Sequence, residues 1–180
     1  TVIVGSLLKP KSKNTSPTNL IIGRSKFFIV EACEYQRAFL NLSPRILVIT
    51  NIDTDHLDYY RDLADIQNAF VALAAKVPRS GKVITEKQYG EIKLPIKLLV
   101  PGEHNQRNAQ AAIAAAKAIG ISERLARRAL ARFRGPWRRL EYLGRTRSGA
   151  RLYDDYGHHP TEIRATLAAI RRDLAPEKLI

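Results

Sequence analysis

Short apolar runs separated by polar segments predict a series of β-strands along the chain. The expected strands are residues 1–8, 27–32, 45–50, 81–85 and 97–100. The runs at 27–32 and 45–50 are mainly apolar and bounded by polar residues, a pattern typical of strands buried on both faces of a parallel sheet. Residues 9–19 are rich in Pro, Ser, Lys and Asn and predict a loop.

Apolar residues at helical spacing predict helices between these strands. The expected helices are residues 35–42, 65–77, 104–119 and 122–133. Pro78 stops the second of them, Gly120 suits the C-cap of the third, and Ser122 suits the N-cap of the fourth. Strands that alternate with helices predict an α/β fold.

A domain boundary is expected near residue 136, where Gly135 and Pro136 interrupt the pattern. Beyond it we expect strands at 140–143 and 150–153, and a helix that begins near Pro160. We therefore predict one domain over 1–136 and a second over 137–180. The second is too short for an independent core, so we expect the first βαβ portion of a truncated domain and a chain that is a piece of a longer protein.

The charge balance narrows the possible partners. The chain has 30 Lys and Arg against 17 Asp and Glu, a net charge of +13, which favours nucleotides, nucleic acid or an acidic membrane surface. A single cysteine, Cys33, excludes an internal disulfide and fits a reducing compartment. Because no apolar run is long enough to span a bilayer and no signal peptide is evident, we expect a soluble cytoplasmic protein.

Polar side chains follow two of the predicted strands. The two clusters comprise Glu31 and Glu34 after the first strand, and Asn51, Asp53, Asp55 and His56 after the second. The carboxyl ends of strands in open α/β sheets are where ligands bind, and this mixture of oxygens and an imidazole suits a divalent cation near phosphate. Solvated charges at a strand end and an Asx-rich turn before a helix are the structural alternatives.

A third polar cluster lies at the start of the alanine-rich helix and comprises His104, Asn105 and Asn108. A helix N-terminus offers free amide donors, and the His104 ring could stack on a base. Ordinary helix capping explains the same residues equally well.

A fourth cluster combines Arg138 and Arg139 with the turn at 154–160. This turn contains Asp154, Asp155, Tyr156, Gly157, His158, His159 and Pro160. Guanidinium groups bind phosphate oxygens in a bidentate manner, and the turn could contact a nucleotide or position an amine. A turn without a functional role is the alternative.

Several common catalytic motifs are absent from the sequence. No Gly-x-x-x-x-Gly-Lys-Ser/Thr loop occurs, since the pair Gly81 and Lys82 is followed by valine and lacks the earlier glycine. A nucleophile elbow, a zinc-binding helix and a Cys pair are also missing. If the chain acts on a nucleotide, the phosphate loop must lie elsewhere.

Taken together, these clusters resemble the Mur ligases of peptidoglycan synthesis. The matching segments, in order, are residues 19–23, 30–40, 49–60, 101–113, 138–141 and 154–163. The resemblance implies a central ATPase domain with a mainly parallel sheet flanked by helices, here without its phosphate loop, followed by a truncated Rossmann-like C-terminal domain. Residues 83–99 are shorter than is usual in the family.

The resemblance also implies an activity. Mur ligases use ATP and Mg²⁺ to convert a carboxylate to an acyl phosphate, which an amine then attacks. Residues 51–60 and 154–162 are most similar to the L-alanine-adding branch, which implies UDP-N-acetylmuramate and L-alanine as substrates, no nucleic-acid or membrane partner, and a monomer or homodimer. The 180 residues alone are expected to be inactive. Another Mur-type or folylpolyglutamate-type ligase, or a nucleic-acid-binding module built on the arginines of 124–151, are the alternatives.

Site residues follow from the same resemblance. It implies that Glu31 and His56 hold Mg²⁺, with support from Asn51 and Asp55. The remaining expected contacts are His104, Asn105 and Asn108 to adenine, Arg139 to phosphate, Asp155 to ribose, and Asn51, Tyr156, His158 and His159 to substrate. Glu31, His56 and Arg139 are thus the expected catalytic residues, and Cys33 is given no catalytic part.

Overall fold

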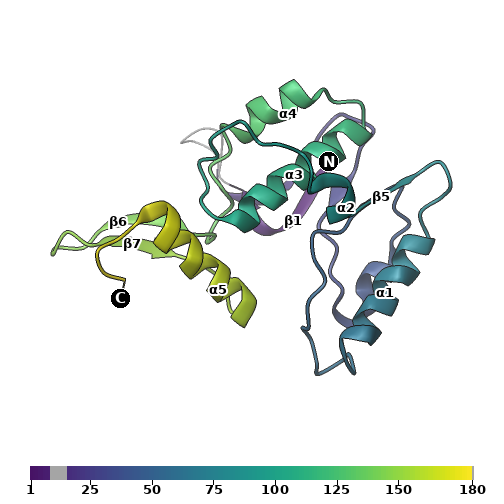
Figure 1. Ribbon diagram of the computed structural model, residues 1–180. Helices are drawn as coiled ribbons and strands as arrows, with labels where there is room; N and C mark the ends of the chain where they lie inside the picture. The colour runs from purple at the N-terminus through teal and green to yellow at the C-terminus, as the bar shows by residue number, and fades with distance from the viewer. Residues whose placement is uncertain (9–15, 180) are drawn as a thin grey trace. The chain divides into compact units, whose positions relative to one another are not determined.

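Two units make up the part of the chain that the computed structural model describes, residues 1–8 and 16–179. Unit 1 consists of Thr1–Glu31, Leu98–Glu103 and Arg132–Ile180, and unit 2 of Ala32–Lys97 and His104–Ala131. Segments distant in the sequence therefore build each unit (Figure 1).

A three-stranded sheet opens unit 1. Strand β1 (Val2–Leu8) lies between β2 (Thr18–Ile21), to which it is antiparallel, and β3 (Ile29–Val30), to which it is parallel. The edge position of β3 leaves 54% of Ile29 exposed. The prediction that this strand is buried on both faces is therefore wrong within the described unit.

The C-terminal part of unit 1 is a β-hairpin followed by a helix. Strands β6 (Glu141–Arg145) and β7 (Arg151–Asp154) are antiparallel. Helix α5 (Pro160–Ala169) begins with proline in its first turn and continues into the π-helix η2 (Ile170–Leu174) (Figure 1). The Arg151 guanidinium donates to the Leu174 carbonyl at 3.1 Å, which connects the hairpin to the end of the helical segment.

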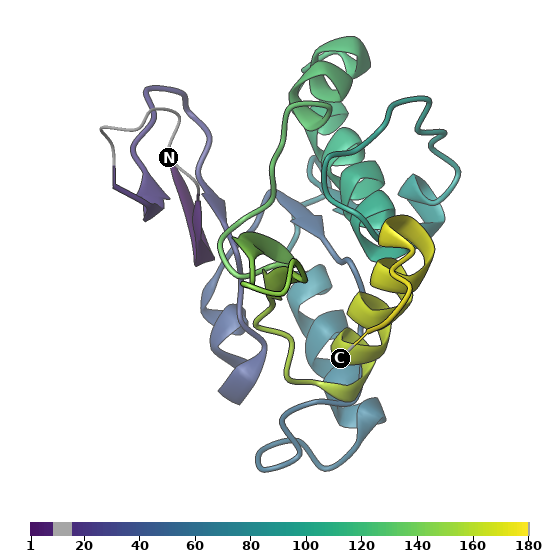
Figure 2. The same cartoon turned by 90° about the vertical axis from the view of Figure 1, so that its left-hand side faces the viewer.

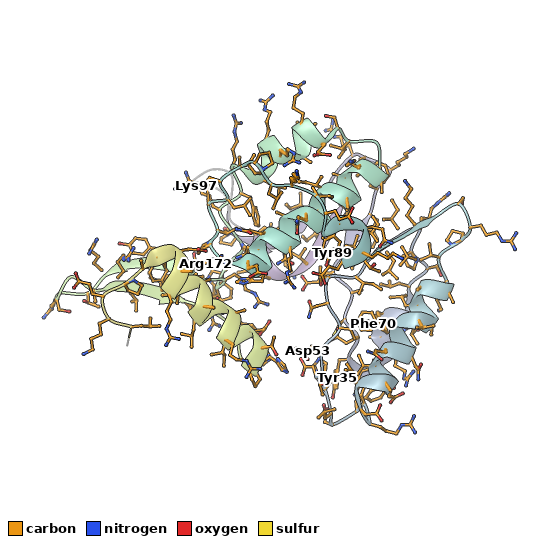
Figure 3. All side chains as sticks on the ribbon, in the orientation of Figure 1. Tyr35, Asp53, Phe70, Tyr89, Lys97 and Arg172 are labelled. Carbon is orange, nitrogen blue, oxygen red and sulfur yellow. The ribbon has the colours of Figure 1, made fainter. Side chains whose placement is uncertain are left out.

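A parallel strand pair and a helix form the first part of unit 2. Strand β4 (Ile46–Val48) pairs with β5 (Lys82–Ile84). Between them runs α1 (Leu63–Ala75), whose N-cap Asp62 accepts from the Asp65 amide at 2.8 Å. The 3-10 helix η1 (Tyr35–Asn41) contributes Phe39, whose ring meets that of Phe70 edge-on at 5.0 Å. Phe70 belongs to α1 and is labelled in Figure 3. The buried residues of this core are Phe39, Leu47, Tyr60, Ile66, Ala69 and Leu73.

The remaining helices of unit 2 are α2 (Glu86–Tyr89), α3 (Glu103–Ala118) and α4 (Glu123–Leu130) (Figure 2). Of these, α2 and α3 contribute to a second core. Ile84, Tyr89 and Ala111 form the buried centre of this core. The Ser122 side chain caps α4 by accepting from the Leu125 amide at 3.4 Å, as predicted. Among the described helices, none combines the length and apolarity needed to cross a bilayer.

The α/β fold class and the order of the predicted helices agree with the predictions from the sequence, whereas α2 was not predicted. The βαβ order expected after residue 136 is wrong, because β6 and β7 form an antiparallel hairpin before α5. Two further local predictions are also wrong. Residues 97–100 form no strand. Leu99, Val100 and Pro101 instead line an open pocket of unit 1, where Leu99 stays 56% exposed and Val100 and Pro101 are partly buried. Thr18 and Asn19, predicted as loop, belong to β2, and residues 9–15 of that predicted loop lie outside the described chain.

Candidate functional site

Three side chains of unit 2 converge as a group of possible metal ligands. One ligand atom each from Glu34, Asp55 and His56 lies within 4.8 Å of the other two, and all three residues are partly buried. The Glu34 carboxylate is 3.6 Å from Nε2 of His56, and an Asp55 carboxylate oxygen is 3.9 Å from its Nδ1. Two carboxylates and an imidazole at these separations fit a divalent cation.

The backbone turn that carries His56 has an unusual conformation. His56 has φ = 54°, in the left-handed region that non-glycine residues seldom occupy. Its amide donates to the Asp55 carboxylate at 2.7 Å, and its carbonyl accepts from the amides of Tyr59 and Tyr60 at 2.9 Å each. These bonds do not form the Asx turn considered as a structural alternative, in which a carboxylate accepts from the amide two residues on, and the next helix is capped by Asp62 instead.

Tyr35 covers one side of His56. The two ring centroids are 4.8 Å apart with an interplanar angle of 39°. The Tyr35 hydroxyl donates to the Asp58 carboxylate at 2.9 Å, and this hydrogen bond raises the pKa of the phenol. The contact restricts the orientations open to the imidazole.

Two buried tyrosines of unit 2 donate hydrogen bonds to backbone carbonyls. Tyr60 donates its hydroxyl to the Glu34 carbonyl at 2.5 Å, and Tyr89 donates its hydroxyl to the Thr50 carbonyl at 2.7 Å. Burial raises the pKa of both phenols, so both remain protonated donors. Sequence reasoning missed both residues, because each hydroxyl reaches a carbonyl that is distant in the sequence.

Glu31 and Asn51 belong to different units. In unit 1 the Glu31 carboxylate accepts from the Gly5 amide at 2.7 Å. A Cβ at position 5 would lie 3.4 Å from both oxygens of Glu31, so the approach of this strand to the carboxylate is close. In unit 2 the Asn51 side-chain oxygen accepts from the Thr50 hydroxyl at 3.2 Å.

The predicted adenine-side residues lie in the first turns of α3. The Asn105 amide nitrogen is 3.1 Å from Nε2 of His104, so these two side chains orient each other. Asn108, one turn further along, is exposed. The structure thus brings His104 and Asn105 into contact and leaves Asn108 open to solvent.

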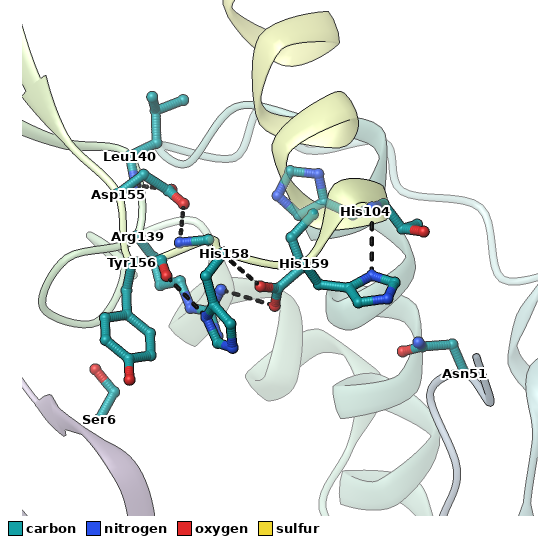
Figure 4. A network of polar contacts seen from close by, with 12 residues as sticks. Ser6, Asn51, His104, Arg139, Leu140, Asp155, Tyr156, His158 and His159 are labelled. Atoms are coloured by element: carbon teal, nitrogen blue, oxygen red, sulfur yellow. Dashed lines mark hydrogen bonds and ion pairs between the residues drawn. The ribbon is translucent and has the colours of Figure 1, made fainter. Parts of the chain in front are cut away.

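In unit 1, Asp155 organises the turn between β7 and α5. Its two carboxylate oxygens accept from the amides of Leu140 and Gly157, both at 2.7 Å (Figure 4). A Cβ at position 157 would lie 2.7 Å from the Asp155 carboxylate, so this close approach requires glycine. The turn is therefore tied to the segment that carries Arg139.

Arg139 is already paired with a carboxylate. It donates to Glu162 at 3.1 Å, and the second oxygen of Glu162 accepts from the His158 amide at 3.3 Å. Burial raises the pKa of Glu162, but the hydrogen bond from Arg139 and the amides of His158 and His159 outweigh it, so the net pKa is lowered. The residues on either side of Arg139 have φ of 52° and 47°, which fixes the direction of its side chain.

The other polar residues of the turn also have partners within unit 1. Arg138 donates to Asp154 at 3.0 Å, and its guanidinium lies 5.2 Å from the centroid of the Tyr156 ring. Nδ1 of His158 is 3.2 Å from the Tyr156 carbonyl, and the His159 ring accepts from the Thr161 amide as the N-cap of α5 (Figure 4). Tyr156 is more than half exposed, so its ring remains accessible.

Arg139 also lines an open pocket of unit 1 of about 280 Å³. Tyr142 and Tyr153 lie in the same pocket with their ring centroids 5.4 Å apart. Leu99 and Leu174 are among its apolar lining residues. None of these four residues belongs to a motif that predicts a functional role.

Two family descriptions match the chain. The Mur ligase middle domain matches residues 14–89, and the Mur ligase glutamate ligase domain matches residues 138–180. The first range contains Glu34, Asp55 and His56, and the second contains Arg139 and Asp155. The domain boundary at 136 stays a prediction.

Individual relatives extend the similarity over nearly the whole chain. The UDP-N-acetylmuramate–L-alanine ligase of Caldicellulosiruptor bescii is 36% identical over 96% of this chain and 46% of its own length. That of Caldicellulosiruptor saccharolyticus is 37% identical over 100% of this chain and 48% of its own. The crystal structure of the UDP-N-acetylmuramate–alanine ligase of Thermotoga maritima superposes with a TM-score of 0.68 at 28% identity, over 84% of this chain and 44% of that one. The chain therefore spans about half the length of the relatives it matches.

Proposed function

Because the chain belongs to the Mur ligase family, we propose that it forms the metal-binding and nucleotide-binding part of an ATP-dependent ligase that joins L-alanine to UDP-N-acetylmuramate. The matching relatives carry the name of that enzyme and resemble this chain over almost all of its residues. The product would be a precursor of peptidoglycan, made in the cytoplasm.

The convergence of Glu34, Asp55 and His56 is the observation that carries this proposal. These three residues follow two different strands, β3 and β4, and their ligand atoms lie within 4.8 Å of one another. When bound, Mg²⁺ would neutralise charge on phosphate oxygens during transfer. His56 and Asp55 would hold it from one loop and Glu34 from the other, while Glu31 is proposed for the magnesium next to the terminal phosphate.

Unit 1 would supply contacts to ATP. Arg139 has the planar donor arrangement that fits phosphate oxygens. It would release its hydrogen bond to Glu162 and donate to a phosphate of the nucleotide instead. Asp155 would contact the ribose, while Tyr156, His158 and His159 would line the region of nucleotide and amino acid. In unit 2, His104, Asn105 and Asn108 would contact adenine.

The proposed partners are small molecules, with a monomer or homodimer as the oligomeric state. A nucleic-acid partner is not proposed, because the relatives that match the chain are named for a sugar nucleotide and an amino acid.

Phosphate release from ATP tests the proposed activity. In a full-length enzyme that carries this chain, we expect phosphate release only when UDP-N-acetylmuramate and L-alanine are both present, with one amide formed per phosphate. Glycine and serine serve as control amines. Release that is independent of the sugar nucleotide, without an amide product, would contradict the proposal.

A further inference from the structure

Tyr60 connects the two loops that carry the cation ligands of unit 2. Its side chain is buried, with 1% of the residue exposed. The hydroxyl donates to the Glu34 carbonyl at 2.5 Å, and the backbone amide donates to the His56 carbonyl at 2.9 Å. One residue therefore holds the backbone of two of the three ligand residues.

The Tyr60 ring is itself held on several sides. The Tyr59 ring meets it edge-on at 5.0 Å, and the Arg37 guanidinium lies 5.5 Å from its centroid. Arg37 is in turn fixed to Asp65 of α1 by a hydrogen bond of 2.6 Å. Because α1 belongs to the buried core, the phenol is anchored to the rigid part of the unit.

The position of the Glu34 carbonyl bears on the cation ligands. Glu34 and His56 approach each other at 3.6 Å, although they follow different strands and are 22 positions apart (56 minus 34). A shift of the Glu34 backbone would move the point from which this side chain starts, and restoring the separation would require a change in its side-chain torsions. Hydrogen bonds to metal-ligand residues commonly set the orientation of those residues.

We propose that the Tyr60 hydroxyl is a positioning group for the divalent-cation site, holding the Glu34 backbone at the distance from His56 that the cation requires. This inference rests on the proposed function only in so far as Glu34, Asp55 and His56 hold a cation. A purely structural role for the same hydroxyl would affect the stability of the unit without a separate effect on metal affinity.

Tyr89 provides a matched control. It is also 1% exposed, and its hydroxyl donates to the Thr50 carbonyl at 2.7 Å in the same unit. Tyr89→Phe therefore removes the same chemical group from an equally buried place. Thr50 is not one of the three ligand residues, so the two variants differ mainly in which backbone carbonyl loses its donor.

Manganese titration of the 180-residue chain, followed by electron paramagnetic resonance, separates the two roles. We expect Tyr60→Phe to raise the Mn²⁺ dissociation constant roughly 10-fold, the size of effect typical of groups that hydrogen-bond to metal-ligand residues. Tyr89→Phe should change it by less than about 2-fold while lowering the melting temperature by a similar amount to Tyr60→Phe. Unchanged Mn²⁺ affinity in Tyr60→Phe, or equal weakening in both variants, would overturn the inference.

A measurement on the unaltered chain covers the case in which Tyr60→Phe fails to fold. During a Mg²⁺ titration, the carbonyl ¹³C resonance of Glu34 should shift together with the ring resonances of Tyr60. The carbonyl ¹³C resonance of Thr50 should not shift. A Glu34 carbonyl that does not respond overturns the inference. Absence of any Mn²⁺ or Mg²⁺ binding removes the cation site and the inference with it, whereas metal binding without ligase activity in the phosphate-release assay contradicts the proposed function alone.

Discussion

The cation-ligand group of unit 2 and the Asp155 turn of unit 1 use hydrogen bonds in opposite ways. In unit 2, tyrosine hydroxyls bond to backbone carbonyls, which leaves the side chains of Glu34 and His56 close together at the loop surface. In unit 1, the side chains themselves form the bonds, since Asp155 accepts from two amides and Arg139 is paired with Glu162. The first arrangement would already be organised for the proposed cation, while the second would have to exchange partners to bind the proposed anion.

This difference has an energetic consequence. A ligand that enters a site organised by the backbone meets side chains already held in position. A phosphate that takes Arg139 must replace the charge-assisted bond to Glu162, so part of the attraction is offset. We therefore expect the metal ligands to tolerate substitution less well than the arginine does.

The largest effect is expected at His56. His56→Ala should lower the turnover of the full-length ligase by about 100-fold or more. Loss of a group that only hydrogen-bonds to a metal ligand already lowers metal affinity or activity roughly 10- to 100-fold. His56→Asn is the matched variant, because asparagine tolerates the left-handed backbone. Steady-state rates over a range of Mg²⁺ measure the effect. Near-normal turnover in both variants would remove His56 from the proposed metal site.

A smaller effect is expected at Arg139. Arg139→Ala should lower kcat/KM for ATP by roughly 100-fold, as for loss of one group that stabilises developing charge. Arg139→Lys should recover only part of the loss, because an ammonium lacks the planar pair of donors. If kcat/KM of the alanine variant fell by less than a few-fold, Arg139 would have only a structural role, as the partner of Glu162 in unit 1. The proposed replacement of Glu162 by a phosphate would then not occur.

The smallest effect concerns the stability of unit 1. The pKa of Glu162 is lowered in the folded chain, so its contribution is complete above the ordinary glutamate pKa of about 4.3 and is lost as the pH falls through the lower folded value. Glu162→Gln should therefore lower the melting temperature by roughly 1–3 °C at pH 7, with a smaller difference near pH 3. Calorimetry across this range measures it, and a double-mutant cycle with Arg139→Ala isolates the pair. A difference that grows toward acid pH would show that Glu162 acts in some other way.

Much of the element order could be predicted because it depends on local patterns. The helix expected at 65–77 is α1 at Leu63–Ala75, and Ser122 is the N-cap that its position before a helical run indicates. The strand prediction at 97–100 is wrong for a physical reason. Short apolar runs can be buried as strands or as irregular segments, and Pro101 gives this one no hydrogen-bond donor at its end.

The candidate site was predictable only where its residues follow strands. Asp55 and His56 lie in the polar segment that follows β4, and this position in the sequence is enough to indicate a possible ligand site. Tyr60 and Tyr89 could not be found in this way, because their hydroxyls reach carbonyls 26 and 39 residues away. A tyrosine within a polar turn carries no local sign of such a contact, and only the fold brings the partners together.

The left-handed backbone at His56 restricts the amino acids that mutation and selection can retain at this position. If variants of the chain were sorted only for folding, glycine, asparagine and aspartate would accumulate at position 56, and valine, isoleucine and threonine would disappear. Histidine would persist only under a further requirement for its imidazole. A saturation library at this single codon, sorted once for folding and once for growth, would therefore separate the demands of the backbone from those of the chemistry.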